Sequence, residues 1–254
     1  MITIISPSKT LGKIKNNNTP EVSIPKFISN SEKLIDVLRN FTVKELKELF
    51  LVSESIATLN FRRFKEWHVP FHENNSTPSI LTFKGDVYGG LNAAEFSRSD
   101  FEFAQQHLRI LSGLYGILRP LDLIQPYRLE MGTNIEVESR KNLYEFWSQI
   151  VTNNLNDELS NSKNQVLLNL ASQEYYKVIN SKKINGTIIT PVFKEQKGPD
   201  FKVVAIYAKR ARGLMSKFIV QNRIEDVEKL KLFDWEGYYF RTDLSTKTNL
   251  VFVR

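Results

Sequence analysis

The strongest candidate for ligand chemistry is a run of basic residues, AKRARGLMSKFI, near the C-terminal end of the chain. On a helix, Lys209, Arg212 and Ser216 share one stripe at spacings of three and four residues. Small residues beside these cations leave room for a phosphate group. The alternative is a solvated helix face, but such a face usually includes acidic residues, and none occurs between Asp200 and Glu225. The pattern therefore favours a helix that faces an anion. Its buried side would consist of Ala208, Ala211, Met215, Phe218 and Ile219.

Two further segments place acidic residues beside basic ones. FKGDVYGGL is expected to be a strand that runs into a glycine-rich turn, with Lys84 and Asp86 on either side of Gly85. This pair could hold an anion and act as acid or base, or it could be a surface ion pair at a turn. In PYRLEMG, Arg128 and Glu130 share one face if the segment is extended, because side chains alternate along a strand.

A third acidic candidate lies in NLASQEY, where a predicted strand ends and a helix begins. Polar groups at such strand ends commonly face a cleft, as Glu174 would here. Carboxylates repel phosphate, so a purely electrostatic binder does not need them near its basic groups. If Asp86, Glu130 and Glu174 share a cleft with cations, the arrangement suits catalysis. The cations expected there are Lys9, Arg128, Lys194 and Lys209.

The segment at about residues 43–66 has the pattern of a helix-hairpin-helix module. In such modules, the backbone N–H groups of the hairpin bind a phosphate. Ser53 is expected at the start of the second helix, and Arg62 and Arg63 would supply charge nearby. The usual hairpin glycines, which permit positive φ, are replaced here by Leu51 and Ser53. The alternative interpretation is two amphipathic helices that only pack on the core.

Composition narrows the function classes. The chain of 254 residues has 35 basic and 28 acidic residues, a net charge of +7 and no cysteine. The positive charge favours polyanionic partners, although a lineage with lysine-rich proteins would also explain it. Without cysteine, thiol peroxidase chemistry and thiolate metal sites are excluded. His68 and His72 are four residues apart, but Pro70 prevents the shared helical face that a metal pair needs. We therefore predict no metal site and no cofactor.

The elements expected to position these residues indicate an α+β or mixed α/β fold. ITIIS and QVLLNLAS have the pattern of buried strands, and NLYEFWSQIVTNNLNDEL that of a long helix. TIITPVFKE and KVVAIYAKRA are predicted to pair as strands across the turn QKGPD. Strands and helices are intermixed and no long linker divides the chain. We expect a single domain over residues 1–254, with a mixed β-sheet flanked by helices, a helix-hairpin-helix-like element and a basic cleft.

The chain as a whole resembles the YaaA family of bacterial peroxide-stress proteins. The segments that carry the resemblance are ISPSKTL, SESIATLNFRRF, FKGDVYGGL, LSGLYGILRPLDLIQPYRLEMG, NLASQEYYKVI, PVFKE and AKRARGLMSKFI. The resemblance implies a cytoplasmic protein with its own type of α/β fold, a positively charged cleft and a helix-hairpin-helix element. It also implies DNA binding and resistance to hydrogen peroxide through limitation of free iron and of Fenton damage to DNA. It implies no particular reaction.

Three hypotheses about function follow. The first is a peroxide-stress protein that binds DNA, with a small phosphorylated ligand as another partner and no membrane association. The second is an enzyme that acts on a nucleotide or nucleic acid in the basic cleft, with Asp86, Glu130 and Glu174 as catalytic candidates. A third, plainer hypothesis is a regulatory or iron-sequestering protein whose charge is incidental. The residues expected to contact DNA or another anion are Lys9, Ser53, Arg62, Arg63, Lys84, Arg128, Lys194, Lys209 and Arg212.

Overall fold

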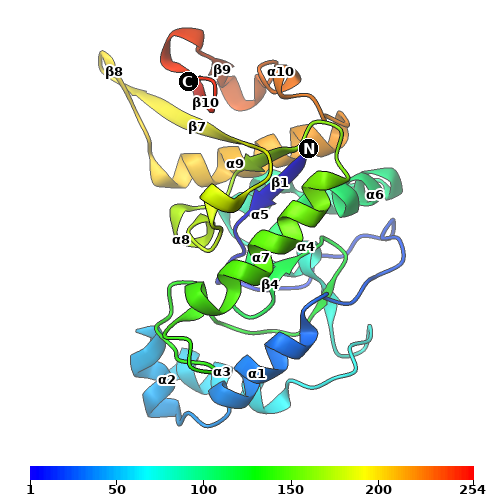
Figure 1. The fold of residues 1–254 in the computed structure, drawn as a ribbon, viewed down its shortest axis with the longest axis vertical. Helices are drawn as coiled ribbons and strands as arrows, with labels where there is room; N and C mark the ends of the chain where they lie inside the picture. Colours follow the sequence, from blue (N-terminus) through cyan, green and yellow to red (C-terminus); the bar gives the residue numbers. More distant parts are fainter.

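A mixed sheet of eight strands forms the centre of the molecule, which a computed structural model describes over residues 1–254 (Figure 1). The strand order is β4-β3-β1-β6-β7-β10-β9, and β8 pairs with β7 outside this path. The five inner strands are parallel, whereas β4, β8 and β9 pair antiparallel. The strands are β1 (Ile2–Ile5), β3 (Leu108–Ser112), β4 (Gly116–Leu118), β6 (Val166–Asn169), β7 (Thr187–Lys197), β8 (Asp200–Lys202), β9 (Tyr239–Phe240) and β10 (Asn249–Val253). The predicted α/β fold with a mixed sheet is confirmed.

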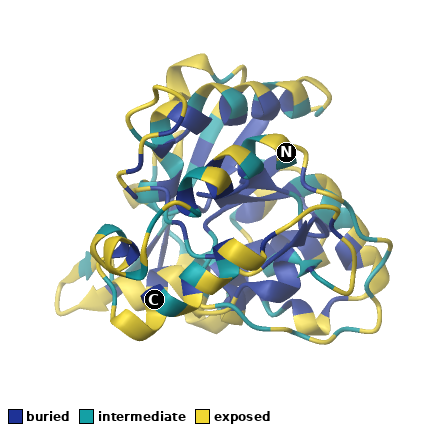
Figure 2. Cartoon of the chain, turned by 90° about the horizontal axis from the view of Figure 1, so that it is seen from below, coloured by how far each residue is buried: buried dark blue, intermediate teal, exposed yellow.

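Helices flank this sheet, and a two-stranded ribbon of β2 (Thr77–Pro78) and β5 (Leu123–Ile124) lies apart from it. Strands β1, β3 and β6 are buried along their whole length, as expected for parallel strands. Figure 2 shows the buried residues on the strands and inner helix faces, with exposed residues around the outside. The helices are α1 (Ile28–Leu38), α2 (Val43–Phe50), α3 (Glu54–Glu66), α4 (Ser79–Thr82), α5 (Asp86–Leu91), α6 (Arg98–His107), α7 (Leu143–Ser160), α8 (Gln173–Tyr176), α9 (Ala205–Gln221) and α10 (Val227–Leu230).

Helices α1, α2 and α3 gather at one end of the longest axis, and β7 to β10 lie with α9 and α10 at the other end (Figure 1). No helix in the structure combines the length and apolarity that crossing a bilayer would require.

Two predicted strands are helical instead. The apolar residues before Gly85 form α4, and α5 begins at Asp86, so the segment is a pair of short helices. Its one strand-like feature is an isolated bridge between Leu11 and Phe83. Likewise, β8 ends at Lys202 and α9 begins at Ala205. A short apolar run has no periodicity long enough to separate a buried helix from a strand, which is why local patterns failed here.

Residues 43–66 form two helices, α2 and α3, joined by Leu51, Val52 and Ser53. The Thr42 hydroxyl accepts a hydrogen bond from the Glu45 backbone N–H, and the Glu45 side chain accepts one from the Thr42 N–H. This capping box fixes the start of α2. Leu51 ends α2 in the left-handed region, with φ 51° and ψ 52°, and is 91% exposed. It therefore adopts the conformation for which glycine is usually chosen.

Candidate functional site

A cavity of about 420 Å³ lies at the carboxyl ends of β1 and β6. These strands are parallel neighbours, but the chain leaves β1 towards β3 on one side and returns to β6 on the other. Ligand sites in open α/β sheets form at such reversals of strand order, because the connections diverge and leave a crevice. The lining comes from residues 6–10 after β1, residues 84–88 at α5, residues 170–175 after β6, and Lys209 and Arg212 of α9.

Hydrogen bonds join the segments that follow the two strands. The Ser172 backbone N–H donates to the Ser6 Oγ at 2.8 Å, and the Ser6 hydroxyl donates to the Ser172 Oγ at 3.1 Å. The Tyr88 hydroxyl donates to the Ser6 carbonyl oxygen at 3.1 Å. Burial raises the pKa of Tyr88 well above its usual value, so this phenol stays protonated. These bonds hold α5 and the segments that follow β1 and β6 together at the cavity.

Glycines let α5 and α9 cross in backbone contact. A Cβ atom on Gly90 would lie 2.3 Å from the Arg210 carbonyl oxygen, and one on Gly213 would lie 1.9 Å from the Val87 carbonyl oxygen. Only glycine fits at both positions, because real side chains do not approach backbone this closely. The crossing brings Asp86, at the start of α5, into the same cavity wall as the basic residues of α9.

Three cations of the lining lack an acidic partner. No carboxylate lies within ion-pair distance of Lys84, Lys209 or Arg212, whereas the neighbouring Arg210 binds Glu236 through its Nε at 2.9 and 3.0 Å. Burial lowers the pKa of the Arg212 guanidinium, which has no carboxylate to offset the cost of desolvation. Arg212 is partly buried without a counter-charge, and the exposed Lys84 and Lys209 lie in the same lining, so the three cations are placed to bind an anion.

The third residue of the predicted basic stripe does not face the ligand. Ser216 is buried, and its hydroxyl donates to the Arg212 carbonyl oxygen at 2.8 Å, one helical turn earlier. The apolar side of α9 is as predicted: Ala208, Ala211, Met215, Phe218 and Ile219 are all buried.

A smaller pocket adjoins the cavity and contains Arg128 and Glu130. The two pockets share Pro7, Ser8, Lys9 and Tyr175 in their linings. Glu130 accepts a hydrogen bond from the Arg128 Nη2 at 2.8 Å, and its other oxygen forms an ion pair with Lys9. Glu130 therefore shares one negative charge between two cations, and it has less capacity to act as a base than an unpaired carboxylate.

Two carboxylates in the main cavity remain available. Asp86 is exposed and has neither an ion pair nor a hydrogen-bond partner, and it lines the wall with Lys84. Glu174 accepts one hydrogen bond, from the Gly132 backbone N–H at 3.2 Å. The structure thus brings Asp86 and Glu174 together with Lys9 and Lys209, which meets the condition of the second functional hypothesis in part. Glu130 and Arg128 lie in the adjoining pocket instead.

The remaining predicted residues lie elsewhere. Lys194 is on β7, on the opposite face from the buried Phe193, and does not line the cavity. Ser53, Arg62 and Arg63 belong to the α2–α3 hairpin at the far end of the molecule (Figure 1). Arg62 is exposed, whereas Arg63 donates to the Asn60 Oδ1 at 3.2 Å. The expectation that Lys194 shares a cleft with the other cations is therefore wrong, whereas Ser53, Arg62 and Arg63 lie in the separate hairpin to which the sequence assigned them.

Sequence patterns missed several residues of the lining, including Ser8, Thr10, Tyr88 and Tyr175. The two tyrosines are buried like ordinary core aromatics, so no local pattern distinguished them. The serine and threonine follow the first strand, and their position after a buried strand of a parallel sheet was the one available signal.

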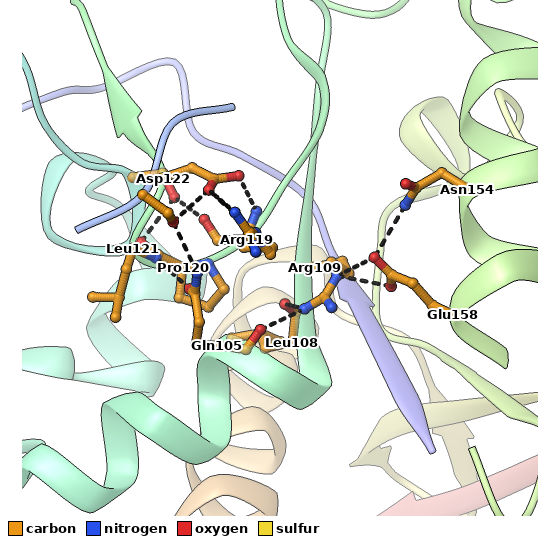
Figure 3. A network of polar contacts seen from close by, with 11 residues as sticks. Gln105, Leu108, Arg109, Arg119, Pro120, Leu121, Asp122, Asn154 and Glu158 are labelled. Atoms are coloured by element: carbon orange, nitrogen blue, oxygen red, sulfur yellow. Dashed lines mark hydrogen bonds and ion pairs between the residues drawn. The ribbon is translucent and has the colours of Figure 1, made fainter. Parts of the chain in front are cut away.

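A second polar cavity shows the contrasting case of cations with partners (Figure 3). The Arg109 Nε donates to both oxygens of Glu158, at 3.0 and 2.8 Å, and Arg119 pairs with Asp122. Asn154 donates a further hydrogen bond to Glu158. Each of these arginines has a carboxylate partner, and the pair of Arg109 with Glu158 ties β3 to α7, which is a structural role.

Comparison of the sequence with known proteins shows its family. The family model described as peroxide stress protein YaaA matches residues 1–244. The chain belongs to the YaaA family. A UPF0246 protein of Aliivibrio fischeri strain MJ11 is 50% identical over 100% of this chain and 98% of its own length. Another UPF0246 protein, from A. fischeri strain ATCC 700601 / ES114, is 49% identical with the same coverage. Membership of the YaaA family makes this chain a peroxide-stress protein.

Proposed function

We propose that this chain acts in peroxide stress as a DNA-binding protein that holds backbone phosphates at the cavity between α5 and α9. The observation that carries the proposal is the convergence of Lys84, Lys209 and Arg212 in one lining without acidic partners. Each phosphate that a lysine or arginine neutralises releases condensed counterions, which favours binding. The net charge of +7 adds long-range attraction to a polyanion.

The same binding would limit iron damage to DNA. Ferrous ions are among the counterions that condense on a phosphate backbone, and a protein that occupies those phosphates displaces them. Peroxide then meets less iron at the DNA. We expect the chain to reduce strand breaks when plasmid DNA is exposed to ferrous iron and peroxide, and the cavity variant below to protect less. Equilibrium dialysis with ferrous iron separates this effect from sequestration, because displacement requires no iron retained by the protein.

The direct test is the double variant Lys209→Ala with Arg212→Ala. It should weaken DNA binding and lower the slope of log affinity against log salt by about two, since each lost phosphate contact removes about one. Lys182→Ala with Lys229→Ala is the matched control, because it removes the same charge from exposed residues outside the cavity. If the cavity variant and this control bind identically, the site assignment is wrong.

The second candidate function is an enzyme that acts on a nucleotide or nucleic acid at this cavity. Asp86 favours it, because an unpaired carboxylate among cations is placed to take a proton from a reacting group. Asp86→Asn removes the repulsion between this carboxylate and phosphate. We expect the variant to bind DNA more tightly, with any turnover of nucleotide or DNA abolished. A fall in DNA binding would argue against a catalytic Asp86.

A further inference from the structure

The dimensions of the cavity restrict what can enter it. A volume of about 420 Å³ equals that of a cube about 7.5 Å on each side, whereas the major groove alone of a duplex is about 12 Å wide. Paired DNA therefore cannot occupy the cavity and can only lie across its mouth. The volume falls within the range of about 300–1,000 Å³ that is typical of small-ligand sites.

The charge of the lining restricts the occupant further. Lys84, Lys209 and Arg212 supply positive charge, but Asp86 and Glu174 line the same space. A bare phosphate would be repelled by both carboxylates. A suitable ligand carries an anion at one end and hydrogen-bond donors at the other, because ionised carboxylates only accept hydrogen bonds. A nucleotide has this combination, with a phosphate, sugar hydroxyls and the amino and imino groups of its base.

The hydrogen bonds in the structure leave the carboxylates of Asp86 and Glu174 largely free to accept from a ligand. Glu174 receives a single backbone N–H, from Gly132, and Asp86 receives none. Glu130, in the adjoining pocket, is by contrast occupied by Lys9 and Arg128. The main cavity therefore has acceptor capacity that the protein leaves unused, close to cations that it also leaves unused.

We infer that the cavity takes one nucleotide at a time, either free or as an unpaired unit of a DNA strand. The inference rests on the proposed function for its DNA source. The phosphate is held by Lys84, Lys209 and Arg212, and donors of the base or sugar are held by Glu174. Paired segments on either side of an unpaired nucleotide stay outside the cavity and contact the exposed surface.

The experiment has two arms, one for each source of the nucleotide. In the first, the four deoxynucleoside monophosphates and inorganic phosphate are titrated against the protein by calorimetry. At least one mononucleotide should bind about tenfold more tightly than phosphate, which corresponds to about 1.4 kcal/mol. In the second, a short duplex carries 2-aminopurine either paired with thymine or as a single unpaired nucleotide. The unpaired duplex should bind more tightly, with a change in 2-aminopurine fluorescence that the paired duplex does not show.

Variants connect the signals to the cavity. Arg212→Gln should abolish mononucleotide binding and the fluorescence change. Glu174→Gln should weaken mononucleotide binding severalfold and strengthen phosphate binding, because it removes both an acceptor and a repulsive charge. These opposite signs do not arise from partial unfolding, and urea unfolding of each variant checks that it is folded. Lys229→Ala is the control outside the cavity.

Each outcome has a defined meaning. Equal affinity for both duplexes, without a fluorescence change and without mononucleotide binding, overturns the inference and leaves DNA binding intact. Mononucleotide binding without binding of either duplex overturns the proposed DNA function and supports the free nucleotide as the occupant. Failure of every probe overturns both proposals. A mononucleotide that binds no better than inorganic phosphate, with unchanged 2-aminopurine fluorescence, reduces the cavity to a phosphate site.

Discussion

At the scale of single residues, the role of a buried or partly buried arginine depends on whether a carboxylate pairs with its guanidinium. Arg109 and Arg212 are both largely withdrawn from solvent, but Arg109 faces Glu158 and Arg212 faces a cavity without a paired carboxylate. Leaving a guanidinium unpaired in a partly buried place costs free energy, which a bound anion would recover. This difference is the reason for assigning a structural role to the first arginine and a binding role to the second.

His107 should make stability depend on pH. Its ring stacks on Phe103, with centroids 4.2 Å apart, and its Nδ1 lies 3.1 Å from the Met1 carbonyl oxygen. Burial lowers the pKa of His107 from its ordinary value of 6.5. The unfolded chain then binds more protons just below that value, so stability is lost as the pH falls through this window.

We expect His107→Gln to lose less stability than the parent chain between about pH 7.5 and about pH 5.5, the interval that spans the ordinary histidine pKa. Urea unfolding midpoints at both pH values measure the difference. An equal loss in both proteins would show that another group carries the pH dependence.

Replacing Leu51 with glycine should make the folded protein more stable. Its left-handed backbone conformation costs an L-residue about 1–2 kcal/mol, and its exposed side chain contributes little packing. Part of the gain is offset by the greater freedom of glycine in the unfolded chain. Leu51→Gly should therefore stabilise the protein by roughly 0.5–1 kcal/mol, measured by urea unfolding. Destabilisation would mean that the side chain has a packing role absent from this structure.

At the scale of elements, the crossing of α5 and α9 decides whether the site exists. Neither helix alone holds both charge types, because Asp86 is on α5 and the unpaired Lys209 and Arg212 are on α9. Their close approach depends on Gly90 and Gly213. The two helices therefore have to pack in this one way for the cavity wall to form.

Adjacent glycines of α5 provide a matched test of this crossing. Gly90→Ala would place a Cβ atom 2.3 Å from the Arg210 carbonyl oxygen, so it should destabilise the protein by about 1–3 kcal/mol and weaken anion binding. Gly89→Ala meets nothing nearer than the Arg210 Nη1 at 4.0 Å, so it should be neutral or stabilising by up to about 1 kcal/mol. Urea unfolding and calorimetry measure the two effects. Similar results for both variants would contradict the packing argument.

At the scale of the whole molecule, most of the basic residues predicted to contact DNA fall into two separate groups. One lines the cavity, and the other lies on α2 and α3 at the opposite end (Figure 1). A single DNA molecule that contacts both groups of basic residues would release counterions at each group. The α2–α3 hairpin stays a predicted DNA contact. It has Leu51 where such hairpins usually have glycine, and the variants below test whether it binds DNA.

Single variants in the two groups test whether they bind the same DNA. Arg62→Ala and Lys209→Ala should each lower the salt slope by about one, and the double variant should lower it by about two. Lys182→Ala should leave the slope unchanged. Fluorescence anisotropy at several salt concentrations measures these slopes. If Arg62→Ala does not alter the slope, the hairpin is only a packing element.

Local pattern determined much of the fold. The long helix α7 and the buried face of α9 follow from periodicity over several residues, because burial on one side imposes that periodicity. The strands β1 and β6 follow from short, continuous apolar runs, which are typical of fully buried parallel strands. Where the pattern was short, as at α4 and α5, it indicated a strand and was wrong.

The sequence by itself determined which chemistry is available to this protein: many cations, no thiols and a few carboxylates in polar segments. Only the tertiary structure decided which of these groups share a space. It placed Asp86 and Glu174 beside Lys84, Lys209 and Arg212, neutralised Glu130 with Lys9, and left Lys194 outside. The physical reason is that pairing and burial of a charge depend on contacts between segments far apart in the chain, which local patterns do not encode.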